Sequence, residues 1–573
     1  MQKCKIKENT NNYNSSANII YDTGTKYHKS DIYKYLSLDE KRLFENNKIY
    51  MHDSEYFDIT LNCVSISLEN LFNNELNINN IKLETPKNLH EIFTQLNIFI
   101  INIENEISGG LTLVNFDYEL DKLLSKLNIE INSQNELFLL IQSLFQIINF
   151  SNSRYGNQSP YVSFTIGIVN NKRGQLICQT ILEVLKIGAS KNKPYIFPNI
   201  HFRVKNGINK DKKDLYHDLF IKALETTSYQ MNPTYILADS EVNKDIDPLH
   251  LHVVGCRSRL LETTNGTKYG IGRTNIGAIS INLPNLAMDT LKEELFLNEL
   301  EIIMEISLKI LIKNQNILKD NNLKYSPILV NNNLLYPFDN NINSILDEAS
   351  LAIGFIGGQE LSDILFPNVS IEEKHIFINK ILGYMSSICK KLSIKYKKIV
   401  TLIGVSGEGM SYYFPQNDKE KENSIRFDNI LKKGFYTNSF HIPVFEKVNP
   451  IEKLQIEGKH HKFCNGGCIS YIEISHIKEN IEGFQDILNL AELNNIHYLG
   501  FNFEKNICNS CEKDIGQNKK CQFCGSSDIT EIRRVSGYLG YLNSFSAGKK
   551  LEEKLRIKHT NINRKKKKKI ILL

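Results

Sequence analysis

Residues 533–559 read RRVSGYLGYLNSFSAGKKLEEKLRIKH, and they follow four cysteines and precede the lysine-rich run 564–569. Chain ends without a role are usually frayed and tolerant of sequence change. A Gly-Tyr-Leu-Gly sequence beside two arginines indicates a segment built for a purpose. Gly537 has two interpretations. It is an ordinary turn glycine, or its Cα–H stores a radical, because a glycyl Cα radical can flatten and spread its electron over the flanking amides.

The cysteine-rich stretch before it, ICNSCEKDIGQNKKCQFCGSS (507–527), has the spacing CxxC, nine residues, CxxC. Two such turns let four thiolates surround one Zn²⁺ tetrahedrally, with Zn–S distances of about 2.3 Å. Gly525, directly after the second pair, permits the tight backbone of such a turn. All four ligand positions are cysteines, so none remains open for water, which predicts a structural metal. An iron centre and unconnected thiols remain the alternatives for Cys508, Cys511, Cys521 and Cys524.

The bulk composition is that of a globular chain in a reducing compartment. Of 573 residues, 41% are hydrophobic and 23% are charged, and the formal net charge is only +5. The lysine run supplies more than all of that charge, so a nucleic-acid partner is not indicated. The N-terminal residues contain no apolar signal core, and no uncharged apolar run reaches the roughly 18 residues of a membrane span. We therefore expect a cytoplasmic protein whose 11 cysteines serve as ligands or catalysts.

Short strand-like runs alternate with helical patterns along the chain. Such runs occur within 159–169, as a strand pair at 193–205, at 397–405 and at 436–445. The stretch 277–318 is expected to form a buried strand, a turn that ends at a proline and a long amphipathic helix. This alternation predicts an α/β architecture with a parallel component.

Taken in order, the motifs of the chain resemble those of the anaerobic (class III) ribonucleoside triphosphate reductases, a family of glycyl radical enzymes. The resemblance covers roughly residues 45–560 and, besides the cysteine and glycine segments, rests on MHDSEYF…NC (51–63), PYIFPNIHFRV (194–204), GCRSRL (255–260), GRTNIGAISINLP (272–284), YTNSFHIPVF (436–445) and NGGCISYIEI (465–474). It implies a ten-stranded α/β barrel with a small C-terminal zinc ribbon and a glycyl radical loop. It also implies a division into an N-terminal extension (1–45), a catalytic barrel with helical allosteric and dimer elements (46–494), a Cys4 zinc-binding module (495–530), the radical loop (531–560) and a basic disordered tail (561–573).

The resemblance gives three residues the central roles. Gly537 would carry the radical after activation by a separate iron–sulfur protein that cleaves S-adenosylmethionine. Cys256, at the tip of a loop in the barrel, would form the thiyl radical that takes the 3′ hydrogen of a ribonucleoside triphosphate, so that the 2′ hydroxyl leaves as water. Cys63, on the opposite side of the substrate, would join in the reduction. Taken alone, either cysteine is more ordinarily a small buried apolar residue.

Further residues receive roles from the same resemblance. Ser258 and Asn275 would hydrogen-bond formate or the substrate hydroxyls, which favours formate over a redoxin as the reductant. Glu408 would donate or accept a proton at the 2′ or 3′ position. His52 and Arg257 would bind the substrate. Without the family, Asn275 is readily explained as an ordinary turn residue.

The chain departs from the family pattern at several points. Tyr50 replaces the first histidine of a His-x-His-Asp pattern, and Ile403 replaces an aromatic hydroxyl before Glu408. The second change puts a proton relay or formate chemistry through that position in doubt. We expect no full ATP cone before residue 45, so on/off control by ATP and dATP is not expected. Control of specificity by deoxyribonucleoside triphosphates at a homodimer interface fits the resemblance.

Two other classes of function compete with this one. A glycyl radical lyase of the pyruvate formate-lyase type would share the barrel and the radical loop. The zinc-type turns argue against it, as does the absence of an adjacent cysteine pair from the sequence. A non-enzymatic zinc-ribbon protein that binds through its lysine run would leave Cys63, Cys256 and the upstream motifs unexplained.

The segment HHKFCNGGC (460–468) offers a further set of potential metal ligands. The resemblance requires only the two glycines of this segment, so we expect free thiols and no second metal there. The residues concerned are His460, His461, Cys464 and Cys468.

Overall fold

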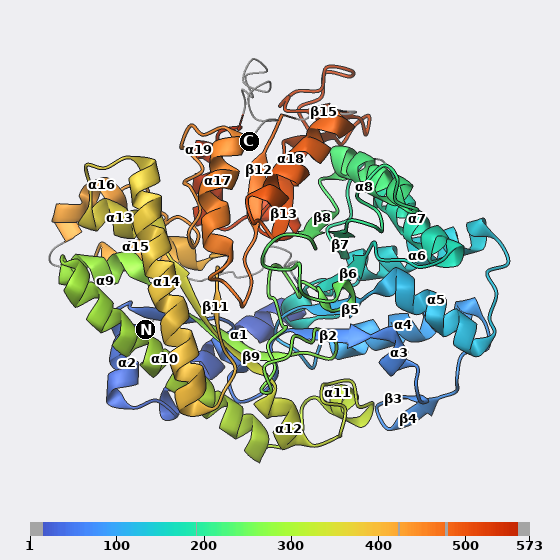
Figure 1. Ribbon diagram of the computed structural model, residues 1–573, viewed down its shortest axis with the longest axis horizontal. Coiled ribbons are helices and arrows are strands. Elements are labelled where there is room, and N and C mark those ends of the chain that lie inside the picture. The colour runs from blue at the N-terminus through green and yellow to red at the C-terminus, as the bar shows by residue number, and fades with distance from the viewer. Residues whose placement is uncertain (1–14, 191, 422–423, 476–479, 560–573) are drawn as a thin grey trace.

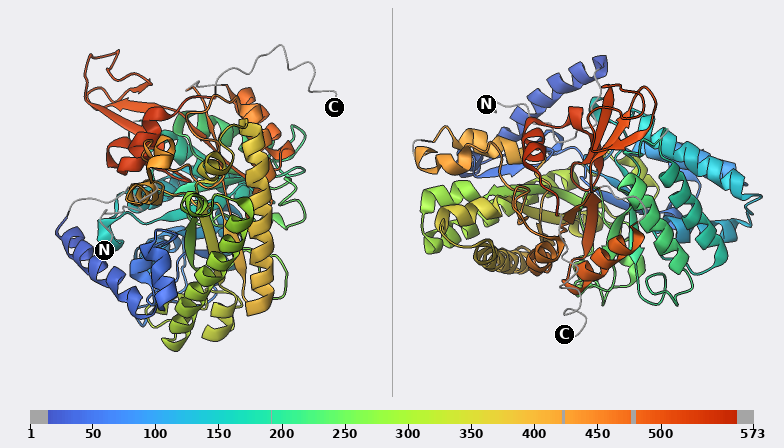
Figure 2. Two further views of the ribbon diagram at one scale, coloured as in Figure 1. Left: turned by 90° about the vertical axis from the view of Figure 1, so that its left-hand side faces the viewer. Right: turned by 90° about the horizontal axis from the view of Figure 1, so that it is seen from above.

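The structure is a computed structural model that describes residues 15–190, 192–421, 424–475 and 480–559. Two β-sheets cross the middle of the molecule, and most of the helices lie around them (Figure 1). Seen from above, the C-terminal segment lies between the N-terminal half and the helices of the central part of the chain (Figure 2). The fold is the mixed α/β type that the alternation of patterns predicted.

The larger sheet has seven strands in the order β12-β13-β8-β7-β6-β5-β2. Their bounds are β2 (Val64–Ser67), β5 (Leu111–Val114), β6 (Val162–Ile166), β7 (Asn199–Val204), β8 (Thr234–Leu237), β12 (Ser470–Glu473) and β13 (Tyr498–Asn502). The strands from β2 to β8 run parallel, whereas β13 is antiparallel to β8 and parallel to β12. Because β13 pairs with both neighbours, this sheet extends past the boundary expected at residue 494 as far as Asn502.

The smaller sheet has the order β1-β9-β10-β11, with β1 (Ile49–Met51), β9 (Asn275–Asn282), β10 (Ser350–Ile356) and β11 (Val400–Ile403). β9, β10 and β11 are parallel, and β1 is antiparallel to β9. Isolated bridges join the two sheets on both sides, one between Val64 and Thr274 and one between Ile403 and Gly467. In the described part of the chain, these two central sheets are separate ladders of seven and four strands, and the two isolated bridges link them.

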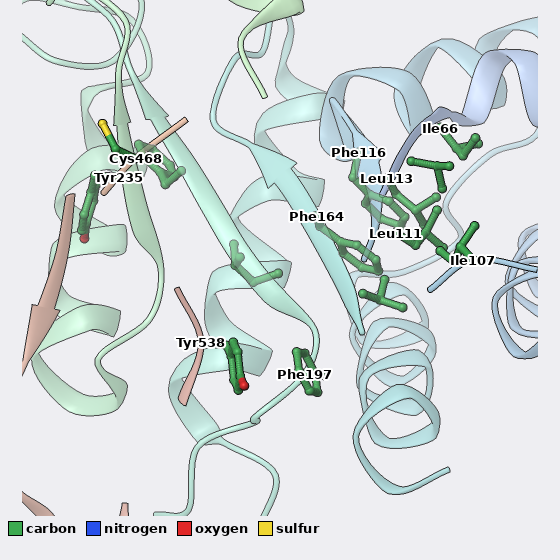
Figure 3. Close-up of a cluster of buried hydrophobic side chains, with 14 of the residues drawn as sticks. Ile66, Ile107, Leu111, Leu113, Phe116, Phe164, Phe197, Tyr235, Cys468 and Tyr538 are labelled. Carbon is green, nitrogen blue, oxygen red and sulfur yellow. The ribbon is translucent and has the colours of Figure 1, made fainter. Parts of the chain in front are cut away.

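Helices follow most of the parallel strands and pack against the sheets. They include α4 (Leu89–Ile103), α5 (Phe116–Leu127), α6 (Gln134–Phe150), α7 (Lys172–Ile187), α8 (His217–Gln230), α9 (Leu283–Thr290), α10 (Glu293–Asp320), α13 (Gly358–Leu365), α14 (Ile371–Tyr396), α17 (Pro450–His461) and α18 (Ile481–Leu493). β6, β7 and β10 are buried at every position, which is typical of parallel strands covered on both faces. Figure 3 shows part of this core, where the rings of Phe116 and Phe164 stack with centroids 4.5 Å apart.

Three local expectations differ from the structure. Residues 193–205 hold one strand, β7, instead of a pair, because the two prolines before it lack the N–H that a ladder requires. Residues 436–445 form turns and no strand. Pro284 lies in the first turn of helix α9, which begins at Leu283, instead of ending a turn, because the first turn of a helix leaves that N–H position unpaired in any case.

A separate four-stranded sheet at the C-terminal end carries the cysteine pairs and the glycine segment. Its order is β15-β14-β16-β17, with β14 (Lys505–Cys508), β15 (Asp514–Gly516), β16 (Ile529–Arg534) and β17 (Leu539–Tyr541), and helix α19 (Ala547–Leu555) follows. All of its ladders are antiparallel. β16 and β17 form a hairpin whose connection contains Gly537, so the sheet that includes Cys508 also positions this glycine.

At the N-terminal end, α1 (Ser16–Asp31) and α2 (Leu38–Glu45) precede β1. Residues 1–14 of the expected extension lie outside the described residues, and so does the expected tail 561–573. Among the helices that the structure describes, none combines the length and the apolar character that a membrane span requires.

Candidate active site

A cavity of about 1450 Å³ is bordered by segments of both central sheets, and most of the predicted site residues line it. They come from the connection after β1, the start of β2, the loop 254–258, the start of β9 and the loop after β11. Gly537 is not on the cavity wall, but its neighbour Tyr538 is. The predicted residues that line the cavity are His52, Cys63, Cys256, Arg257, Ser258, Asn275 and Glu408.

The loop that carries Cys256 is a tight hairpin. Val254 and Ser258 exchange both backbone hydrogen bonds, at 2.8 and 3.1 Å. Gly255, with φ of +59°, supplies the left-handed turn, and a Cβ on Gly110 would lie only 2.7 Å from the Gly255 Cα. The thiol of Cys256 is thus held at the hairpin tip.

Gly537 is buried directly against this hairpin. A Cβ atom on Gly537 would lie 2.0 Å from the Cys256 carbonyl oxygen, which no side chain tolerates. Arg534 holds the glycine segment in place: its Nη1 donates to the Gly537 carbonyl at 3.1 Å and its Nε to the Phe501 carbonyl at 2.9 Å. The structure therefore brings the predicted radical glycine and the predicted thiyl cysteine into backbone contact.

Cys63 lies on the neighbouring wall of the cavity. Its backbone N–H donates to Asn275 Oδ1 at 2.8 Å, and its Sγ accepts from the Gly110 N–H at 3.4 Å. Asn275 Nδ2 in turn donates to Asn62 Oδ1 at 3.3 Å. Burial raises the pKa of Cys63 to about 12, so the side chain is a neutral thiol at neutral pH. A neutral thiol can give up a hydrogen atom.

Glu408 is paired with a residue that the sequence analysis did not select. Tyr538 donates its phenolic hydrogen to Glu408 Oε2 at 2.6 Å. The Tyr538 ring packs against Tyr161, with centroids 5.3 Å apart, and against Phe197, with centroids 5.6 Å apart. Figure 3 shows Tyr538 beside Phe197. The signal for Tyr538 was its position directly after Gly537, but its partner could be found only from the tertiary structure.

The two predicted substrate-binding residues, His52 and Arg257, form hydrogen bonds with different parts of the protein. His52 Nε2 lies 2.8 Å from Ser280 Oγ. The Arg257 guanidinium turns toward the protein, where Nη1 donates to the Gly404 carbonyl and Nη2 to the Tyr471 hydroxyl, both at 3.0 Å. Binding of substrate by His52 and Arg257 stays a prediction. In this position Arg257 orients the loop after β11 through its hydrogen bond to the Gly404 carbonyl.

The four C-terminal cysteines form a compact group. All four Sγ atoms lie within 4.8 Å of one another, with 3.5 Å between Cys508 and Cys524 and 3.5 Å between Cys511 and Cys521. Four thiolates around a tetrahedral ion with bonds of about 2.3 Å would be separated by about 3.8 Å. The group therefore fits one metal ion, as the spacing predicted.

Comparison with known proteins identifies the family of this chain. The sequence profile of the family described as anaerobic ribonucleoside-triphosphate reductase matches residues 8–559. The chain belongs to this family. It is 28% identical over 567 residues to the anaerobic ribonucleoside-triphosphate reductase of Haemophilus influenzae, covering 91% of this chain and 79% of that one. It is also 28% identical to the reductase of Enterobacteria phage T4, covering 90% of each chain.

Solved structures of anaerobic ribonucleotide reductases share the fold. One matches with a TM-score of 0.73 at 18% identity and covers 95% of this chain and 86% of the other. The enzyme of Thermotoga maritima in complex with dATP and CTP matches with a TM-score of 0.72 at 19% identity and covers 95% and 92%. At these identities the likeness concerns the fold.

The reductase cavity has one wall that sequence reasoning missed. Helix α1 contributes residues to the lining, although none of its own side chains is buried. Tyr21 on α1 meets Tyr56 with 2.8 Å between the hydroxyls, and Lys29 pairs with Glu55 at 3.1 Å. The cavity exceeds the roughly 300–1,000 Å³ of ordinary small-molecule sites, so it has room for a nucleotide and a second small molecule.

Proposed function

We propose that this chain reduces ribonucleoside triphosphates to 2′-deoxyribonucleoside triphosphates by a glycyl and thiyl radical mechanism, with formate as the reductant. The observation that carries the proposal is the contact between Gly537 and the Cys256 hairpin beside a cavity that also contains Cys63. Family membership supports the reaction class. A cytoplasmic enzyme that requires no nucleic acid and no membrane is part of this proposal.

In the first half of the reaction, a separate iron–sulfur activating protein that cleaves S-adenosylmethionine removes one hydrogen atom from the Gly537 Cα. The Gly537 radical takes the hydrogen of the Cys256 thiol, and the thiyl takes the 3′ hydrogen of the substrate. The 3′ hydroxyl loses its proton, the unpaired electron moves to C2′ beside a 3′ ketone, and the 2′ hydroxyl leaves as water with one added proton. The Glu408–Tyr538 pair is suited to supply that proton, because it holds an acid and a hydroxyl 2.6 Å apart.

In the second half, the Cys63 thiol gives a hydrogen atom to C2′, which leaves a 3′ ketone and a thiyl on Cys63. Formate returns a hydrogen atom to Cys63, and the remaining electron and one proton reduce the ketone while CO₂ is released. Cys256 finally returns the hydrogen to C3′. Overall, one formate and one proton convert a ribonucleotide to a deoxyribonucleotide, CO₂ and water. Ser258 and Asn275 line the cavity, which supports the proposal that they bind formate or the substrate hydroxyls.

The decisive experiment is X-band electron paramagnetic resonance on anaerobic protein treated with an activating protein, S-adenosylmethionine and a reductant. We expect a doublet that disappears on exposure to air, together with backbone cleavage at Gly537. Activated enzyme given ¹⁴C-formate should release labelled CO₂ in a one-to-one ratio with deoxyribonucleotide formed.

A redoxin in place of formate provides the control for the reductant. A doublet with turnover on the redoxin alone would keep the radical mechanism and reject formate. No doublet with an activating protein that works on a related reductase would reject the radical mechanism itself.

The finer architecture also belongs to the proposal. We infer that the strands of the two sheets, apart from β1, act as one ten-stranded barrel, because bridges connect the sheets on both sides and each half then contains five strands of one direction. We also infer that the Cys508–Cys524 group holds Zn²⁺, which when bound cross-links the sheet that carries Gly537. Four cysteine donors leave no position for a reacting water, so this metal would be structural.

A homodimer regulated by nucleotides completes the proposal. Helices α10 and α14 expose apolar side chains, among them Ile302, Ile376 and Ile394, at 54, 65 and 80%. Such residues support a partner surface on these helices. A structural relative holds dATP in its specificity site, which supports control by deoxyribonucleoside triphosphates. Mass measurement in solution, with and without dATP, tests both.

A further inference from the structure

A second cluster of potential metal ligands lies behind the Cys256 hairpin, outside the cavity. His461 ends α17, Cys468 precedes β12 and His497 precedes β13. One ligand atom from each lies within 4.8 Å of the other two. The three residues are 0, 1 and 2% exposed, and Cys468 is labelled among the buried side chains of Figure 3.

Hydrogen bonds orient the His461 imidazole, and its Nδ1 accepts the His497 backbone N–H at 3.3 Å. Ser470 Oγ donates to Glu457 Oε2 at 2.6 Å, so this hydroxyl accepts from His461 Nε2 at 2.9 Å. The proton of His461 is therefore on Nε2, and the lone pair of Nδ1 faces His497 Nδ1 at 3.0 Å. A carboxylate that orients an imidazole through its second nitrogen is the usual support of a metal-bound histidine.

Two buried guanidinium groups lie near Cys468. Arg257 and Arg259 are both buried, and in the described part of the chain neither forms an ion pair with a carboxylate. Burial raises the pKa of Cys468 well above its ordinary value, so the side chain would become a thiolate only when a metal ion replaces its proton.

We propose that His461 Nδ1, Cys468 Sγ and His497 Nδ1 bind a second metal ion of the Zn²⁺ type. Thiolate and imidazole together select zinc over the hard cations. Binding releases the Cys468 thiol proton, and the His497 proton moves from Nδ1 to Nε2. The family resemblance had indicated free thiols here, because it requires only the two glycines of the 460–468 segment; His497, distant in sequence, joins this segment only in the fold.

This site would stiffen the support of the Cys256 hairpin. A Cβ on Gly467 would lie 2.0 Å from the Arg257 carbonyl oxygen, and the Arg259 N–H donates to the Gly466 carbonyl at 2.9 Å. The turn between Cys464 and Cys468 is thus packed against the hairpin backbone. This consequence rests on the proposed function, whereas the metal site itself does not.

Metal content of the full chain, expressed with added zinc and measured by plasma mass spectrometry, tests the proposal. We expect about two zinc ions per chain in the wild type, one in Cys508→Ser/Cys511→Ser, one in Cys468→Ala and none when all three changes are combined. Cys178→Ala removes another buried thiol, on α7, and should keep both ions. One zinc in the wild type and none in Cys508→Ser/Cys511→Ser would overturn the proposal.

Cobalt provides a second measurement that does not depend on the stability of Cys468→Ala. Cys508→Ser/Cys511→Ser refilled with Co²⁺ should show a sulfur-to-cobalt charge-transfer band and the visible bands of a tetrahedral ion. His497→Gln in that background should weaken or shift these bands, and Cys178→Ala should not. Absence of a charge-transfer band in the background protein would reject thiolate ligation and with it the site.

Discussion

Gly537 and Cys256 touch through their backbones: a Cβ on the glycine would lie 2.0 Å from the Cys256 carbonyl oxygen and 2.7 Å from its Cα. Both sides of this contact are main chain, so no change of rotamer can relieve it. The hairpin β16–β17 and the Cys256 loop therefore meet at a separation set by the fold. This is the path along which we propose that a hydrogen atom passes.

Gly537→Ala is expected to abolish both the radical signal and deoxyribonucleotide formation. The added methyl group collides with the Cys256 backbone, and it also hinders flattening of a Cα radical. Electron paramagnetic resonance and a turnover assay check the two losses. Gly24→Ala, on α1 with no atom within 4 Å of the new methyl group, is the matched control and should retain the signal. A normal doublet in Gly537→Ala would place the radical elsewhere.

Tyr538→Phe is expected to lower turnover by about 10²-fold or more without removing the glycyl radical. The change deletes the hydrogen bond to Glu408 and so the donor of the proposed proton relay, whose class of effect is about 10²–10⁴-fold. Glu408→Gln should cause a similar loss, and the double variant should lose little more, because the two side chains act as one unit. Additive losses would show that they act independently.

Asn275→Ala is expected to reduce turnover by about 10²-fold through misplacement of Cys63. It leaves the Cys63 N–H without its acceptor, which costs about 1–3 kcal/mol of unfolding free energy. Asn332→Ala is the control, because that asparagine binds the Asn77 N–H at 2.7 Å away from the cavity. It should lose stability in denaturant unfolding but keep its turnover. Equal losses of turnover in Asn275→Ala and Asn332→Ala would show that Asn275 does not position Cys63.

Glu360 predicts a loss of stability as the pH rises through the acidic range. Burial raises the pKa of Glu360 from 4.5 to about 7. The unfolded chain therefore loses this proton first, so the contribution to stability is complete below about pH 4.5 and disappears by about pH 7. Its upper limit is about 3 kcal/mol at 1.36 kcal/mol per pKa unit.

Glu360→Gln should remove this part of the pH dependence. Urea unfolding at pH 5 and pH 8 is the measurement, and the variant should gain on the wild type only at pH 8. Glu130→Gln, at an exposed position, should show no such difference. If the wild type and Glu360→Gln differed in stability by the same amount at both pH values, ionisation of Glu360 would not be costing the folded protein stability.

Cys508→Ser/Cys511→Ser is expected to loosen the hairpin that holds Gly537. β14, which ends at Cys508, is paired with β16, which leads into the glycine segment. Hydrogen exchange of residues 505–541 should accelerate, and the radical yield after activation should fall. Unchanged protection of β16 against hydrogen exchange would show that the metal does not hold the Gly537 segment in place.

The parts of the site that could be predicted lie in short motifs beside strand ends. Cys63 and Asn275 each adjoin a strand, and the four zinc-type cysteines are paired within a few residues. Contacts between residues far apart in the sequence leave no such motif. The hydrogen bond between Tyr538 and Glu408 and the cavity wall formed by α1 both depend on the tertiary structure. Residues 436–445 have a strand-like composition but form turns, because composition does not determine where backbone donors find acceptors.

The hairpin with Gly537 belongs to its own sheet and shares no described ladder with the two central sheets. Withdrawal of this hairpin would break side-chain contacts, such as those of Arg534 and Tyr538, but no central strand pairing. Under the proposed mechanism, an activating protein must reach Gly537 outside its buried position, whereas turnover requires the buried position. These few contacts would then set the free-energy difference between two positions of the hairpin, so a change that weakens them would favour activation at the expense of turnover.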